Sequence, residues 1–120
     1  MTASKSQPLF GREPDVDIPA MRKSAAQATA FLRAIANEDR LLLLCQLTQG
    51  ERCVGDLEAL TGIEQPTLSQ QLSVLRAESL VSTRREGKFI YYGLQDDRVP
   101  SMLAALQGLF CKINRKSKKE

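Results

Sequence analysis

The sequence contains no histidine and no pair of cysteines in a C-x-x-C arrangement. A catalytic thiol is normally activated by a nearby base, so these absences argue against a thiol oxidoreductase, and we expect that the protein is not an enzyme. Asp96 and Asp97 have no imidazole partner and form a poor transition-metal site on their own. We therefore expect neither a bound metal nor a cofactor.

Long apolar stretches are also missing. No segment has the length and apolarity of a membrane span, and residues 1–17 lack the apolar core of roughly 7 to 15 residues that defines a signal peptide. We expect a cytoplasmic protein whose three cysteines are mostly reduced.

The chain is 120 residues long, which predicts one domain at residues 19–114. We expect a disordered tail at 1–18 and a basic tail at 115–120. Charge is unevenly distributed, because residues 1–64 hold 7 basic and 9 acidic side chains whereas residues 65–120 hold 10 and 5. The positive half is the better candidate for contact with nucleic acid.

Two short helices separated by a glycine turn are predicted near the middle of the chain. Val54, Leu57 and Leu60 recur at three-residue steps, and Gly62 ends that helix. The next helix, in QPTLSQQLSVLR, buries its leucines and leaves a face of short polar and amide side chains, which suits hydrogen bonding to base edges in the major groove. The predicted DNA-contacting residues of this segment are Gln65, Thr67, Ser69, Gln70 and Gln71.

A β-hairpin is predicted directly after these helices. Aromatic and β-branched residues alternate on both sides of Gly87, and the tip carries Arg84, Arg85 and Lys88, which can contact phosphates. Each feature alone is common on ordinary protein surfaces. Their order, a helix-turn-helix followed by a basic hairpin, predicts a winged helix. A winged helix that binds protein instead of DNA remains an alternative.

Further helices are predicted on either side of this unit. One stretches from Pro19 to Ala36, the next is capped by Asn37, and the last is opened by Pro100. The fold class is therefore mainly α with a β-hairpin wing, in the order α-α-α-α-β-β-α. The last helix has a wide apolar face, so we expect a homodimer through the first and last helices that binds palindromic DNA.

With these elements in place, the chain resembles the ArsR/SmtB family of dimeric winged-helix repressors between Ala25 and Cys111. The similar segments are FLRAIANEDRLLLLCQL, ERCVGDLEALTGI, QPTLSQQLSVLRAESLV and REGKFIYYGL. The resemblance implies that the polar face of the helix in QPTLSQQLSVLR contacts the operator. It also implies that the wing contacts the DNA backbone. Many members have a histidine where this chain has Gln71.

The cysteines suggest what such a repressor would sense. Metal-sensing members of this family have a CVCDL pattern at the start of the helix-turn-helix. The similar segment of this chain is CVGDL, which has Cys53 but has Gly55 in place of the second cysteine. Cys45 and Cys111, 66 residues apart, instead resemble the cysteine pair of the sulfide-responsive BigR/SqrR-type branch. That likeness implies redox sensing by Cys45 and Cys111, with reactive sulfur species such as persulfide or polysulfide as the inducer. The alternative is an arsenite- or soft-metal-responsive repressor that uses Cys53 with Cys45 or Cys111.

Overall fold

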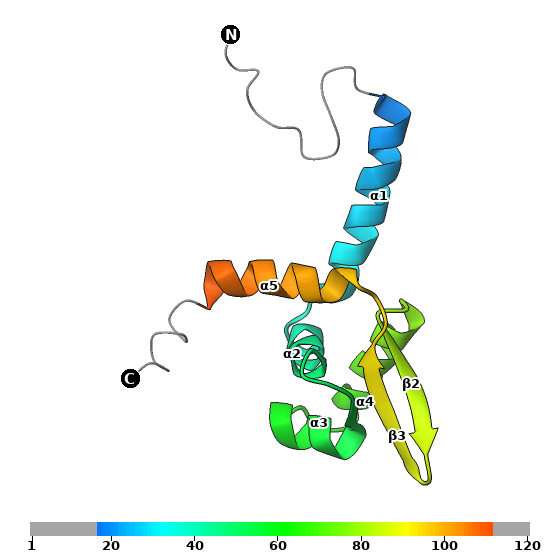
Figure 1. Cartoon of the computed structure of the whole chain (residues 1–120), viewed down its shortest axis with the longest axis vertical. Helices are drawn as coiled ribbons and strands as arrows, with labels where there is room; N and C mark the ends of the chain where they lie inside the picture. Colours follow the sequence, from blue (N-terminus) through cyan, green and yellow to red (C-terminus); the bar gives the residue numbers. More distant parts are fainter. Residues whose placement is uncertain (1–16, 112–120) are drawn as a thin grey trace. The chain divides into compact units, whose positions relative to one another are not determined.

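The computed structural model describes residues 17–111, and the chain divides into two compact units. The first unit ends at Ile35 and contains helix α1 (Ile18–Ile35). The second begins at Ala36 and contains the remaining elements (Figure 1), which are α2 (Glu38–Leu47), β1 (Arg52–Cys53), α3 (Val54–Thr61), α4 (Thr67–Ala77), β2 (Val81–Glu86), β3 (Phe89–Leu94) and α5 (Arg98–Phe110). This order confirms the predicted winged-helix fold and adds one short strand, β1.

The predicted tails fall almost wholly outside the described residues. Ile18, which we had assigned to the N-terminal tail, is the first residue of α1. Residues 115–120 are not described. No helix among residues 17–111 has both the length and the apolarity to cross a membrane.

Local sequence explains where α2, α3 and α4 begin and end. The Asn37 side chain accepts a hydrogen bond from the Arg40 amide at 3.0 Å, as expected of a cap for α2. Gly62 has a φ of 78°, and its amide donates to the Glu58 carbonyl at 2.9 Å, which closes α3 as predicted. Ile63 is then buried beneath the turn.

The core of the second unit lies where α2 packs against α3, α4 and β3. The sequence of α2 is apolar on nearly all sides, yet its Leu42 is 44% exposed. The side chains with less than 2% exposure come from every helix of this unit and from the start of the wing: Leu43, Leu44, Leu57, Leu68, Leu72, Leu75, Leu80, Val81 and Val99.

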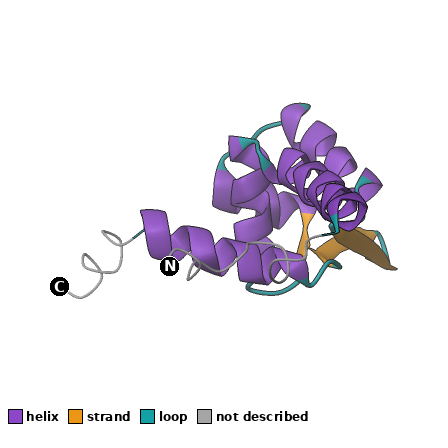
Figure 2. Ribbon diagram, turned by 90° about the horizontal axis from the view of Figure 1, so that it is seen from above, coloured by secondary structure: helices purple, strands orange, loops and turns teal. Residues whose placement is uncertain are grey.

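The wing is an antiparallel sheet with the strand order β1-β3-β2. Gly87 turns the β2–β3 hairpin with a φ of 65°. In Figure 1 the tip of this hairpin extends past α3 and α4, and Figure 2 shows the strands at one edge of the second unit. The strand β1 was not predicted, because two residues are too few to show an alternating pattern.

Helix α5 begins at Arg98, two residues before the predicted start at Pro100. The Asp96 carboxylate accepts the Arg98 amide at 2.9 Å and pairs with the Arg98 guanidinium at 2.6 Å. This Asx turn satisfies an amide at the start of the helix, so the helix can begin before the proline.

Candidate DNA-binding surface and thiol pair

Helix α4 presents the polar face that the sequence predicted. Its buried side is formed by Leu68, Leu72 and Leu75. Ser69 and Gln70 are exposed on the other side, whereas Thr67 and Gln71 are half-buried. Ser69 and Gln70 are therefore the most exposed of the predicted DNA-contacting residues within α4.

Two glutamines of the predicted DNA-binding set are held by hydrogen bonds within the protein. The Gln65 oxygen accepts the Ser69 amide at 3.0 Å, and the Gln71 oxygen accepts Nη1 of Arg40 at 2.7 Å. Because a guanidinium only donates, the Gln71 amide oxygen must face Arg40, which leaves its NH₂ group as the donor for an outside acceptor. The Arg40 contact joins α2 directly to the recognition helix α4.

The three predicted cations of the wing differ in their surroundings. Arg85 and Lys88 are exposed, and neither forms an ion pair within the described range 17–111. The Arg84 guanidinium instead lies between two carboxylates, 2.8 Å from Glu51 and 2.7 Å from Glu86. The hydrogen bonds that Arg84 donates, first to Glu86 and then to Glu51, raise the pKa of Arg84.

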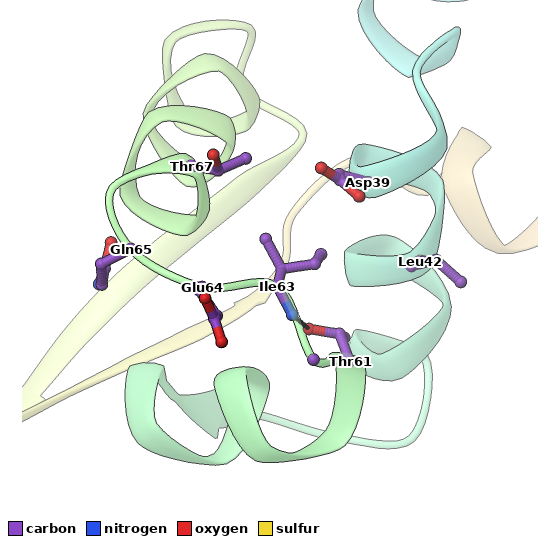
Figure 3. A pocket seen from close by; sticks show the side chains of 8 residues that line it. Asp39, Leu42, Thr61, Ile63, Glu64, Gln65 and Thr67 are labelled. Carbon is purple, nitrogen blue, oxygen red and sulfur yellow. Dashed lines mark hydrogen bonds between the residues drawn. The ribbon is translucent and has the colours of Figure 1, made fainter.

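A shallow depression of about 430 Å³ lies between α2 and the turn that joins α3 to α4 (Figure 3). Asp39 and Leu42 line it from α2, and the Ile63 amide donates to the Thr61 hydroxyl at 3.1 Å in its floor. Glu64 adds a second carboxylate to the lining. Two carboxylates make this part of the surface unfavourable for DNA phosphates.

Cys45 and Cys111 come from elements far apart in the sequence, α2 and the end of α5. Both are half-buried free thiols. Burial raises the pKa of the Cys45 thiol, and the charge of Cys111 raises it further. Charges interact most strongly at short range, so this effect means that Cys111 lies within electrostatic range of Cys45.

Cys53 lies outside this pair, at the start of α3, and its side chain does not cap the helix. Asp96 is engaged by Arg98, and that hydrogen bond lowers the pKa of Asp96. Across residues 17–111 there is no cluster of three or more His, Cys, Asp or Glu side chains that could hold a metal ion.

Sequence reasoning did not identify Arg40 and Glu51, which hold Gln71 and Arg84. Both lie in segments that resemble the family, but sequence does not show their partners, because each acts on a residue about thirty positions away. Only the packing of α2 against α4 and the pairing of β1 with β3 bring these residues together.

Comparisons with known proteins agree with this geometry. The family described as "Bacterial regulatory protein, arsR family" matches residues 37–83. The biofilm growth-associated repressor of Agrobacterium fabrum is 47% identical over 97 residues, which cover 81% of this chain and 83% of that protein. The transcriptional activator HlyU of Vibrio cholerae is 38% identical over 100 residues, covering 83% and 93%.

A solved structure shows the same fold. The crystal structure of the transcriptional repressor BigR from Xylella fastidiosa matches with a TM-score of 0.74 and 42% identity, covering 80% of this chain and 98% of that chain. The chain therefore belongs to the bacterial ArsR family of winged-helix, DNA-binding transcriptional repressors, and it is not an enzyme.

Proposed function

We propose that this protein is a homodimeric repressor that binds a palindromic operator while reduced and releases it when polysulfide links Cys45 to Cys111. Two observations support the proposal: both thiols are free and half-buried, and the charge of Cys111 contributes to the raised pKa of Cys45. The similarity to biofilm growth-associated repressors supports the role of a repressor. Within residues 17–111 no three His, Cys, Asp or Glu side chains form a group that could hold a metal ion.

The chemistry needs only the two thiols and the polysulfide. One cysteine thiolate attacks an inner sulfur of the polysulfide, and the bond from that sulfur to its neighbour breaks and releases a thiolate. The second cysteine thiolate attacks the same transferred sulfur and displaces the rest of the chain as a second thiolate. The polysulfide is thereby reduced to two thiolates, and the two cysteines are oxidised to a trisulfide.

On the DNA side, Ser69 and Gln70 would contact base edges together with Thr67 and the donor group of Gln71. Gln65 would support this surface by capping the first turn of α4. Arg85 and Lys88 would contact phosphates beside the groove.

Dimerisation through α1 and α5 would place two α4 helices about 34 to 36 Å apart, one turn of the operator. The end of α5 supports this arrangement, because Leu109 and Phe110 are 67% and 76% exposed. Two adjacent apolar side chains so exposed fit a contact with a second copy of the chain.

Release follows from the position of the bridge. A link between α2 and the end of α5 constrains α2, and the 2.7 Å hydrogen bond from Arg40 to Gln71 connects α2 to the recognition helix. A small movement of α2 then changes both the orientation of Gln71 and the spacing of the two α4 helices. An allosteric coupling of about 1 to 3 kcal/mol would lower operator affinity roughly 5- to 150-fold.

The experiment is operator binding by wild type and by Cys45→Ser, Cys53→Ser and Cys111→Ser, each treated with polysulfide, peroxide or arsenite. We expect polysulfide to release wild type and Cys53→Ser but neither of the other two variants. Release by arsenite that depends on Cys53 would instead support a soft-metal sensor. Failure of reduced wild type to bind any DNA would favour a winged helix that binds protein.

A further inference from the structure

Arg84 of the wing contacts two carboxylates and an aromatic ring of the protein itself, which a residue that only binds phosphate would not need. Its Nε donates to Glu51 at 2.8 Å, its Nη1 donates to Glu86 at 2.7 Å, and its guanidinium lies 4.9 Å from the centroid of the Tyr91 ring. Tyr91 is the cross-strand partner of Arg84, so the arginine side chain lies over its own neighbour in the sheet.

Glu51 reaches Arg84 across the whole sheet. The strand order is β1-β3-β2, so Glu51, next to β1, and Arg84, on β2, lie on opposite sides of the central strand β3. Pairing of Arg52 with Tyr92 places the preceding Glu51 opposite Gly93. A Cβ atom at Gly93 would lie only 3.1 Å from Cγ of Glu51, and Gly93 is not among the glycines with positive φ. The absence of a side chain at position 93 therefore makes room for Glu51.

We propose that Glu51 and Arg84 are positioning residues that set the angle of the wing on the DNA, and that Arg85 and Lys88 are the residues that contact phosphates. The strand β1 leads directly into α3, so the link from Glu51 to Arg84 ties the wing to the start of the helix-turn-helix. This inference rests on the use of the wing in the proposed function.

The direction in which one substitution changes DNA affinity distinguishes a positioning role from a purely electrostatic one. Glu51→Gln removes a negative charge that lies beside Arg84 of the wing, so electrostatics alone predicts tighter binding. If Glu51 positions the wing, binding weakens. An exposed ion pair is a weak interaction, and with one in each wing of a dimer we expect a loss of about 2- to 30-fold.

The test measures affinity against salt concentration for reduced full-length protein and a labelled duplex, selected by wild type from random-sequence DNA. A phosphate contact contributes about 0.9 to the slope of log K against log salt, or about 1.8 per dimer. We expect Arg85→Gln to lower the slope by that amount, and Glu51→Gln and Arg84→Gln to weaken binding with the slope unchanged. In a double-mutant cycle, the variant with both Glu51→Gln and Arg84→Gln should bind DNA only slightly more weakly than either single variant.

Gly93→Ala provides a variant without any change of charge. The added Cβ requires Glu51 to shift by a few tenths of an ångström. Where this shift loosens the pair with Arg84, binding should weaken with an unchanged slope, whether or not the charge variants fold. The inference is overturned if Glu51→Gln binds as tightly as wild type or tighter, or if Arg84→Gln lowers the slope as Arg85→Gln does. Failure of the sensing proposal would appear separately, as operator binding that does not respond to polysulfide.

Discussion

Cys45 differs from an ordinary core cysteine because the charge of a second thiol, Cys111, acts on its pKa. Burial is the larger cause of its raised pKa, and the charge of Cys111 is the smaller one. At neutral pH the Cys45 thiol is therefore mostly protonated, and its reaction with electrophiles should accelerate as the pH rises toward and beyond the ordinary value of 9.0.

This pairing predicts how one cysteine changes the other. Cys111→Ser removes a group whose negative charge raises the pKa of Cys45, so the pKa of Cys45 should fall. We expect iodoacetamide to alkylate Cys45 faster in Cys111→Ser than in wild type at the alkaline pH where thiols titrate, measured by peptide mass spectrometry. Cys53→Ser is the control and should leave the rate unchanged. An equal or slower rate in Cys111→Ser would show that the two thiols do not interact.

At the scale of elements, the helix boundaries depend on single capping residues, and sequence identified those that act locally. Asn37 and Gly62 were predicted because a cap interacts with residues within four positions. The predicted start of α5 at Pro100 was wrong by two residues, because the Asp96 carboxylate accepts the Arg98 amide and the helix begins before the proline. Leu42 is exposed although its sequence surroundings are leucine-rich, since burial depends on which elements pack around α2.

The same distinction applies to the DNA-binding surface. The polar face of α4 follows from helical periodicity, so sequence predicts its exposed Ser69 and Gln70. The states of Gln71 and Arg84 could not be predicted, because their partners Arg40 and Glu51 come from other elements. Sequence therefore predicts which residues form the surface, and only the packing shows which of them are engaged within the protein.

The Asx turn that Asp96 forms at the start of α5 predicts an effect on stability. Asp96→Ala removes the acceptor for the Arg98 amide and should lower the free energy of unfolding by about 0.5 to 2 kcal/mol, measured by urea denaturation. The hydrogen bond from Arg98 lowers the pKa of Asp96, so this contribution is present above the ordinary value of 3.8 and is lost as the pH falls below it. The difference between wild type and variant should therefore shrink in acid. A constant difference down to strongly acidic pH would contradict this role.

At the scale of the whole molecule, the proposed repressor depends on a dimer formed in part by the end of α5. Phe110→Glu places a charge on a side chain that is 76% exposed and should raise the dimer dissociation constant about 30-fold or more, the effect expected of a hot-spot residue. Sedimentation equilibrium measures this change. Leu60→Glu is the matched control, on an apolar α3 side chain that is 50% exposed, and should leave the dimer intact. A dimer unchanged by Phe110→Glu would place the interface elsewhere.

The central claim is that Cys45 and Cys111 form the sensor and the winged helix is the part that responds. Tandem mass spectrometry of protein released from operator DNA by polysulfide tests it most directly. We predict a peptide pair joined between Cys45 and Cys111 and heavier than a disulfide by at least one sulfur atom, with Cys53 unmodified. Released protein that carries only a direct disulfide between Cys45 and Cys111, or a modification of Cys53 alone, would contradict the account.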